Sequence, residues 1–300
     1  MTLPLTELAP GGPRLSPIVA GAWRMADWHW DAQQRLRWIE ECVELGVTSF
    51  DHADIYGGYA VEGLFGEALG LAPALRERLQ LVGKCGIKLV APARPEHRIK
   101  HYDSSAAHIA TSVDASLRAL RTDRLDLLLI HRPDPLMDAD EVARAFESLR
   151  AAGKVRHFGV SNFAPAQFEL LASRFPLVTN QIELHPLQRA ALTDGTLDQL
   201  QRLRIRPMIW SPLAGGALIL GGGEAERRVQ AALGRIGERL GASAASVAFA
   251  WLLRHPSRPL PVAGSRRIEA LREAVAALRL TLDAQDWTEV WQAAAGHEVA

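Results

Sequence analysis

Short apolar runs rich in β-branched residues alternate along the chain with longer segments of helical periodicity. The runs that we expect to be strands cover residues 18–23, 47–51, 79–85, 124–131, 155–161, 177–183, 205–211 and 259–264. After each run, apolar residues recur every three to four positions, which is typical of a helix with one buried face. These helical segments cover 31–46, about 61–70, 104–121, 138–153, about 165–173, about 193–203, two stretches within 225–254, and 266–278. Eight strand–helix pairs predict an α/β fold, a (β/α)8 TIM barrel, with a doubly wound sheet as the main alternative.

Local signals at the ends of these segments support the division. Asp31 is a candidate N-cap for the first helix, and Gly46 is a candidate stop after it. Before the first strand, "TELAPGGPRLS" is typical of a hairpin with Gly11 and Gly12 in its turn, which could close the bottom of the barrel. No composition shift or Gly/Ser linker divides the chain, so we expect one domain over residues 1–300.

Composition narrows the class of partner. The 300 residues are 48% hydrophobic and 23% charged with a formal net charge of zero, so nothing indicates binding to nucleic acid or anionic lipid. The N-terminus lacks the pattern of a signal peptide, and no apolar run reaches the length of a membrane span, so we expect a cytoplasmic protein. Cys42 and Cys85 are too few for a disulfide framework and are interpreted as packing thiols.

Polar residues stand at the carboxyl ends of the expected strands, where TIM barrels carry their chemistry. They are Asp51 with the loop to Tyr56, Lys84, His131, Ser161, Asn162, Gln181, Trp210, Ser211, Gly264 and Ser265. If the barrel is correct, all of them converge on one mouth.

Four of these side chains suggest an acid site. Tyrosine has a pKa of ~10, which makes it a weak acid for protonating a carbonyl oxygen at neutral pH. A nearby ammonium group favours the ionised form, so we expect it to lower the pKa of the tyrosine. Lys84, held by Asp51 from the neighbouring strand, would supply that ammonium group to Tyr56. His131 could then orient a substrate oxygen by a hydrogen bond. The alternative is a purely structural ion pair between Asp51 and Lys84.

A metal site is a second interpretation of "FDHADIY", because His52 and Asp54 follow Asp51 directly. Strand alternation turns His52 away from the face used by Asp51, and no second histidine has the spacing of a metal ligand. We therefore expect no metal, and we expect His52 and Asp54 to hydrogen-bond loop backbone.

Neither common nucleotide fingerprint, GxGxxG or the Walker loop, is present. Backbone N–H groups in "SPLAGG" (211–216) could still hold phosphate, and so could "GSRR" (264–267), where a loop enters a helix and two arginines follow the serine. A glycine-rich loop is, however, more often only a turn.

Several separated motifs give the chain a resemblance to a known family. "FDHADIY", "GKCG", "LLLIHRPDP", "GKVRHFGVSNF", "NQIELHP", "WSPLAGG" and "PVAGSRR" occur in the order found in the aldo-keto reductases, from Gly21 to Glu273. Within that family the chain resembles a bacterial oxidoreductase branch related to the potassium-channel β-subunits. The resemblance implies a (β/α)8 barrel that binds NADPH in extended form, with NADH as an alternative cofactor.

The resemblance also implies roles for individual residues. Asp51, Tyr56, Lys84 and His131 match the catalytic tetrad. The residues matching cofactor contacts are Gly21, Ala22, Trp23, Ser161, Asn162, Gln181, Trp210, Ser211, Pro212, Leu213, Ala214, Gly215, Gly216, Gly264, Ser265, Arg266 and Glu273. Among them, Ser161, Asn162 and Gln181 match carboxamide contacts and Trp210 the ring stacked on nicotinamide. Ser211–Gly216 match the pyrophosphate loop, and Ser265 and Arg266 match the 2′-phosphate site.

Three positions depart from the family pattern. The interval "GGYAVE" after Tyr56 is longer than usual, and Gly264 replaces a lysine that often precedes the 2′-phosphate serine. Ala270 and Ala274 stand where an arginine and an asparagine are usual. These departures leave the preference for NADPH over NADH a prediction.

The resulting hypothesis is an NADPH-dependent reductase of aldehydes or ketones, a small-molecule enzyme in which Tyr56 is the general acid. Trp23, Trp28, Trp30 and Tyr59 either line an aromatic substrate pocket or pack loops, and the basic stretch 93–105 either borders that pocket or is solvated. One alternative function is a cofactor-binding regulatory subunit with little turnover. Another is an aldolase that forms a Schiff base on Lys84. The substrate and the oligomeric state are not predicted.

Overall fold

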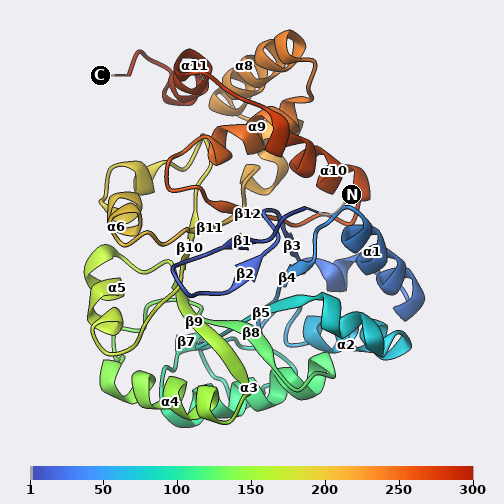
Figure 1. The fold of residues 1–300 in the computed structure, drawn as a ribbon, viewed down its shortest axis with the longest axis vertical. Helices are drawn as coiled ribbons and strands as arrows, with labels where there is room; N and C mark the ends of the chain where they lie inside the picture. The colour runs from blue at the N-terminus through green and yellow to red at the C-terminus, as the bar shows by residue number, and fades with distance from the viewer. Residues whose placement is uncertain (1–2, 300) are drawn as a thin grey trace.

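A closed barrel of eight parallel strands forms the centre of the protein, as the alternation of strands and helices predicted (Figure 1). The computed structural model describes residues 3–299. The barrel strands are β3 (Val19–Gly21), β4 (Ser49–Asp51), β5 (Gln80–Cys85), β8 (Leu125–Ile130), β9 (Val155–Ser161), β10 (Asn180–Glu183), β11 (Met208–Trp210) and β12 (Leu260–Ala263). They follow one another round the barrel in chain order, and β12 pairs with β3 to close it. The doubly wound alternative is therefore wrong.

Helices surround the barrel and cover its outer face (Figure 1). They are α1 (Ala32–Glu44), α2 (Val61–Leu71), α3 (Ala106–Leu120), α4 (Ala139–Ala151), α5 (Pro165–Ala172), α6 (Thr196–Arg202), α7 (Ala217–Leu220), α8 (Glu224–Leu240), α9 (Ala244–Leu253), α10 (Ile268–Ala276) and α11 (Ala284–Ala295). The Asp31 side chain accepts a hydrogen bond from the Gln34 N–H and caps α1, as predicted. Gly46 follows α1 with φ of 83°, a conformation that glycine adopts without strain. Among the described residues, no helix is long and apolar enough to cross a membrane.

Burial on both faces explains why the strands contain so few polar residues. Every residue of β8 (LDLLLI) is buried, because one side faces the barrel interior and the other faces helices. The one charged residue there, Asp126, accepts hydrogen bonds from the Leu81 N–H at 2.9 Å and from Arg76 at 3.3 Å. Cys42 and Cys85 are buried and free, as expected of packing thiols, and burial raises the pKa of both.

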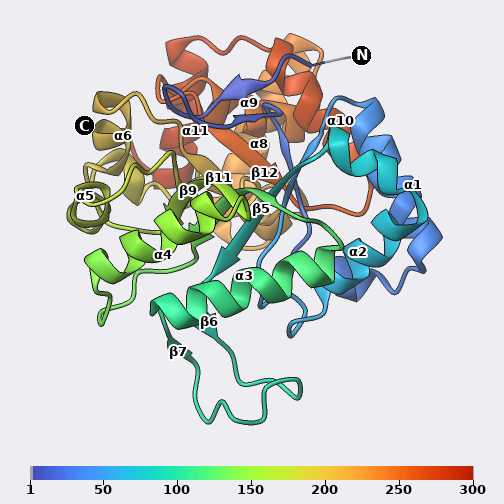
Figure 2. The ribbon, with the colours of Figure 1, turned by 60° about the horizontal axis from the view of Figure 1, so that its bottom comes forward.

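The predicted N-terminal hairpin is present and closes one end of the barrel. Its strands are β1 (Thr6–Glu7) and β2 (Arg14–Leu15), and the hairpin side chains of Leu8 and Leu15 are fully buried. The Arg206 N–H donates to the Leu8 carbonyl at 2.7 Å, which ties the hairpin to the segment before β11. Figure 2 shows the hairpin and the long loop between β6 (Ile87–Lys88) and β7 (His101–Tyr102) at opposite ends of the molecule.

Two features were not anticipated from the sequence. Helix α11 packs outside the barrel, where the Trp251 and Trp287 rings stack at 4.9 Å and exchange indole-to-carbonyl hydrogen bonds of 3.0 Å. The β6–β7 hairpin, which pairs residues on either side of the polar connection after β5, carries that connection to the open end of the barrel. Five short 3₁₀ helices complete the described elements: 25–28, 73–78, 190–192, 214–216 and 277–279.

Candidate active site

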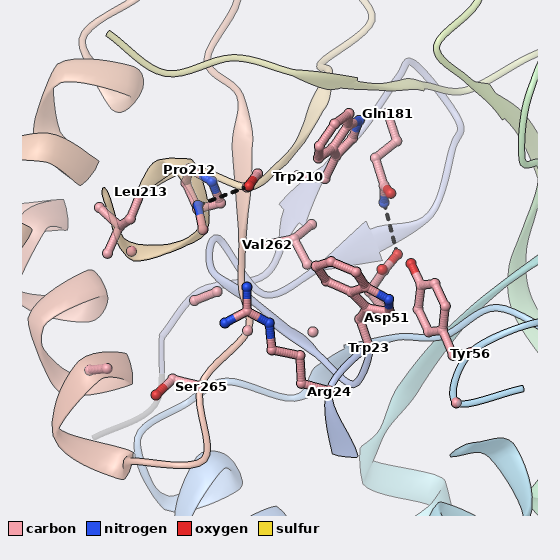
Figure 3. A pocket seen from close by; sticks show the side chains of 18 of the residues that line it. Trp23, Arg24, Asp51, Tyr56, Gln181, Trp210, Pro212, Leu213, Val262 and Ser265 are labelled. Carbon is pink, nitrogen blue, oxygen red and sulfur yellow. Dashed lines mark hydrogen bonds between the residues drawn. The ribbon is translucent and has the colours of Figure 1, made fainter. Parts of the chain in front are cut away.

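A cavity of about 790 Å³ opens at the carboxyl ends of the barrel strands (Figure 3). The residues that line the cavity are spread along its length: in Figure 3, Ser265 and Leu213 lie on one side, and Asp51 and Tyr56 lie on the other. The structure thus brings most of the predicted strand-end residues to one cavity, because parallel barrel strands present their ends together.

Lys84 is the centre of a buried polar cluster at one end of this cavity. Its ammonium group donates to Asp51 Oδ2 at 2.6 Å, to the Tyr56 hydroxyl at 2.9 Å and to the His52 carbonyl at 2.9 Å. The other Asp51 oxygen accepts from the Gln181 amide at 2.8 Å. Lys84 and Asp51 are both buried, so solvent does not compete for these contacts. The structure thus brings Asp51, Tyr56 and Lys84 together, and their catalytic roles stay a prediction.

The protonation states follow from burial and these contacts. Burial lowers the pKa of Lys84, but Asp51 and Tyr56 together raise it by a larger amount. The net pKa lies above its usual value, so the amine stays charged. Burial raises the pKa of Tyr56 more than the Lys84 charge lowers it. The expected net lowering of the Tyr56 pKa is therefore wrong for the protein alone. A neutral phenol beside a fixed ammonium group is nevertheless the form that can donate a proton.

His131 faces the same space from the end of β8. Its ring lies edge-on to the Tyr56 ring with centroids 5.8 Å apart, and its Nδ1 has no hydrogen-bond partner within residues 3–299. Burial lowers the His131 pKa well below its usual range, and the charges of Lys84, Arg132 and Lys100 lower it further. A neutral imidazole is therefore available to donate one hydrogen bond to a bound oxygen.

A chain of polar contacts extends from this cluster along the strand ends. The Ser161 hydroxyl donates to the Gln181 carbonyl at 2.9 Å, and the Asn162 amide donates to Ser161 Oγ at 2.7 Å. The Trp210 indole donates to Asn162 Oδ1 at 2.9 Å. Asn162 has φ of 61°, a left-handed conformation that costs free energy in a non-glycine residue. These hydrogen bonds hold the Asn162 amide group at a fixed position on the cavity wall.

The far part of the cavity is glycine-rich and cationic. Gly215 and Gly216 have φ of 67° and 108°, which brings bare backbone to the cavity wall. The Arg24 side chain extends into the middle of the cavity (Figure 3). Besides Gly215 and Gly216, the predicted cofactor positions that line the cavity as a whole are Gly21, Trp23, Asn162, Gln181, Trp210, Ser211, Pro212, Leu213, Gly264, Ser265 and Glu273. Ala22, Ser161, Ala214 and Arg266 are absent from the lining, whereas Arg267, next to Arg266, is present.

Sequence reasoning missed Arg24 and Arg132, both of which line the cavity. Each directly follows a predicted site residue, because Arg24 follows Trp23 and Arg132 follows His131. Arg267, which also lines the cavity, belongs to the stretch 264–267 already considered for phosphate binding. The basic stretch does reach the cavity through Lys100. Of the aromatic residues considered for a substrate pocket, only Trp23 lines it. Trp28 and Trp30 instead pack in a ring cluster with Trp38.

His52 does not behave as expected. His52 is fully buried against the Phe65 ring at 4.5 Å, and neither of its ring nitrogens has a hydrogen-bond partner within residues 3–299. Burial lowers its pKa to about 3, so the ring is neutral. The expectation that His52 hydrogen-bonds loop backbone through its ring is wrong, because Phe65 and the barrel wall enclose it. No group of three His, Cys, Asp or Glu in the described part of the chain is placed to hold a metal ion.

Asp54 instead belongs to a buried pair of carboxyl groups outside the barrel. It accepts a hydrogen bond from Ser112 at 2.7 Å and shares a smaller cavity, of about 330 Å³, with Glu62. Burial raises the pKa of Asp54 to about 7. Burial and the neighbouring Asp54 raise the pKa of Glu62 to about 8.

Because the pKa values of these carboxyl groups are raised, we expect the free energy of unfolding to fall as pH rises. Between about pH 4.5 and pH 8 the folded protein holds a proton on Glu62 that the unfolded chain releases, so the free energy of unfolding falls across this range. Glu62→Gln should reduce that fall by on the order of 2–4 kcal/mol. Urea unfolding at pH 5 and pH 8 measures the effect, with the exposed Glu147→Gln as the control. Equal pH slopes in Glu62→Gln and the parent protein would contradict it.

Comparisons with known proteins agree with this architecture. The sequence model of the Aldo/keto reductase family matches residues 17–295. The chain is 54% identical to the oxidoreductase YdhF of Escherichia coli K12, covering 97% of this chain and 98% of that one. It is 49% identical to a 6-dehydroglucose reductase of Agrobacterium fabrum, covering 95% and 96% of the two chains. An aldo/keto reductase from Klebsiella pneumoniae, solved in complex with NADP and acetate, superposes with a TM-score of 0.77 at 25% identity, covering 97% and 94%.

The protein is a (β/α)8 barrel with a tyrosine and a lysine in hydrogen-bond contact at the carboxyl ends of its strands, and its relatives are oxidoreductases. The chain belongs to the aldo/keto reductase family. The resemblance seen in the sequence motifs is thereby confirmed.

Proposed function

We propose that the protein reduces an aldehyde or ketone to an alcohol with NADPH. The observation that carries the proposal is the 2.9 Å contact between the Tyr56 hydroxyl and the buried Lys84 ammonium group, at the end of an elongated cavity. When bound, the nicotinamide cofactor supplies the hydride. The chain itself must supply the proton and the binding sites.

In this mechanism Tyr56 gives its phenolic proton to the carbonyl oxygen as that oxygen gains negative charge. Lys84 stabilises the phenolate that remains, and Asp51 keeps Lys84 charged and oriented through the 2.6 Å contact. Neutral His131 donates a hydrogen bond to the same oxygen and sets its direction. Tyr56 regains a proton before the next turnover.

The cavity suits a dinucleotide in extended form. The amide groups of Asn162 and Gln181 are the candidates to hold the carboxamide, with Trp210 as the stacking ring. Bare backbone at Gly215 and Gly216 allows close approach of phosphate, and Arg24 offers a guanidinium group beside it. Ser265 and Arg267, with the neighbouring Arg266, favour NADPH through its 2′-phosphate. The relative solved with NADP supports the same choice.

The geometry argues against the Schiff-base alternative. All three N–H groups of Lys84 are used in hydrogen bonds, and its neighbours keep it charged, whereas a Schiff base needs a neutral amine with room to react. The regulatory-subunit alternative differs from the reductase only in turnover, so activity decides between them. A carbonyl panel should include 6-dehydroglucose, the compound in the name of the Agrobacterium relative.

Cofactor binding is expected to quench the intrinsic fluorescence of the protein. Titration with NADPH should quench at lower concentration than titration with NADH, because only NADPH carries the 2′-phosphate. Trp210→Ala should remove a large part of the quenching and weaken NADPH binding by roughly 10-fold, since a stacked aromatic contact is worth ~1 kcal/mol or more. Trp291→Ala, on helix α11 outside the cavity, is the matched control. No response to either nucleotide would sink the reductase proposal.

A further inference from the structure

Two cations at the substrate end of the cavity lack acidic partners. Arg132 follows His131 at the end of β8, and Lys100 comes from the loop between β6 and β7. Both line the cavity, yet neither makes a recorded ion pair or side-chain hydrogen bond within residues 3–299. The Arg132 guanidinium group lies over the Trp210 ring, 5.5 Å from its centre.

Both charges act at the place where a carbonyl oxygen would sit. Arg132 and Lys100 each contribute to lowering the His131 pKa, after burial and Lys84, so their fields reach that imidazole. Asp51 cannot balance them, because its two oxygens are already used by Lys84 and Gln181. Glu273, the other acid in the cavity lining, belongs to helix α10 at the far part of the cavity. The substrate end therefore carries an uncompensated positive charge.

Cofactor phosphates do not account for this excess. The cations placed for phosphate are Arg24 and Arg267. A Cβ atom at Gly215 would lie 3.6 Å from Arg24, which puts that guanidinium group beside the glycine-rich loop. Arg267 lines the same part of the cavity as Ser265. Arg132, by contrast, directly follows His131, and the charges of both Arg132 and Lys100 act on the His131 ring.

We propose that the preferred substrate carries an oxyanion, a carboxylate or a phosphate, a few atoms away from its carbonyl group. The proposal rests on the proposed function and adds the substrate class. The Arg132 guanidinium group can make two parallel hydrogen bonds to such a group, and Lys100 adds a second positive charge from the loop. Ile55, Ile87 and Leu89 line the same end, so a short aliphatic spacer is accommodated between the carbonyl and the anion.

A matched pair of aldehydes separates charge from size. Succinic semialdehyde and its methyl ester differ chiefly in the carboxylate charge. We expect kcat/KM for the acid to exceed that for the ester by at least 10-fold at low salt. The ratio should fall as salt rises to about 0.5 M, because salt screens exposed charges. NADPH oxidation measures both rates.

Substitution of the cations tests which groups are responsible. Arg132→Gln should reduce the acid-to-ester ratio by at least 10-fold, and Lys100→Met by a smaller factor, because Lys100 is exposed and Arg132 is partly buried. Any general damage to the cavity lowers both rates together and leaves the ratio unchanged. Arg98→Gln, exposed on the same loop and absent from the cavity lining, should leave the ratio as it is.

The outcomes are distinct from those of the proposed function. If neutral aldehydes are reduced and the ester equals or exceeds the acid, the reductase stands and the anionic substrate class is overturned. An acid preference that survives Arg132→Gln would also overturn it. Absence of NADPH oxidation with every carbonyl, despite NADPH binding, would overturn both proposals and favour the regulatory-subunit alternative.

Discussion

Replacing Tyr56 by phenylalanine is expected to lower kcat for carbonyl reduction by roughly 10²–10⁴-fold, the usual contribution of a positioned general acid. The substitution removes one oxygen and leaves the ring, so the packing against His131 at 5.8 Å is kept. Lys84 loses one of three acceptors but retains Asp51 and the His52 carbonyl. NADPH binding should therefore change little while turnover collapses. Stopped-flow NADPH oxidation and fluorescence titration measure the two effects separately.

Tyr102→Phe provides the matched control for this prediction. Tyr102 lies on the exposed strand β7 and is absent from the cavity lining. The kcat of Tyr102→Phe should therefore stay within about two-fold of that of the parent protein. Retention of the parent rate by Tyr56→Phe would mean that another group protonates the substrate. His131 would then be the next residue to test.

The barrel was predictable because its signal is repeated. Strands buried on both faces read as short apolar runs, as "LDLLLI" in β8 does, and each is followed by a helix with one buried face. The polar residue that ends such a run is conspicuous for the same reason. Asp51, Lys84 and Gln181 stood out at strand ends, and the structure joins them through the 2.6 Å and 2.8 Å contacts.

Other features depend on packing that the sequence does not display. His52 is one residue from Asp51, but its ring is enclosed by Phe65 of helix α2 rather than by the loop. Asp54 pairs with Glu62 because α2 and α3 enclose both, which raises their pKa values to about 7 and about 8. The direction in which the Tyr56 pKa shifts depends on whether burial or the Lys84 charge has the larger effect. The spacing of residues along the sequence cannot show which effect is larger.

Replacing Lys84 by methionine is expected to cost about 3–5 kcal/mol of folding free energy as well as nearly all activity. The change leaves the Asp51 carboxylate buried with the Gln181 amide as its one recorded side-chain partner, and a buried charge without its counterion is strongly destabilising. Urea unfolding at pH 7 measures the loss. Lys154→Met is the matched control, because its bond to Asp114 has the same length, 2.6 Å, but both side chains are 39% exposed. Loss of that surface ion pair should lower the free energy of unfolding by less than about 1 kcal/mol.

The double variant Asp51→Asn/Lys84→Met tests whether the cost comes from the stranded charge. Removing both charges should recover about 1–3 kcal/mol relative to Lys84→Met alone, because no buried ion then remains without a partner. Activity should not recover with stability, since Tyr56 still lacks the ammonium group that stabilises its phenolate. If the double variant is as unstable as the sum of the single changes, Lys84 stabilises the fold through packing alone. The ion pair would then be needed for the chemistry of Tyr56 rather than for the fold.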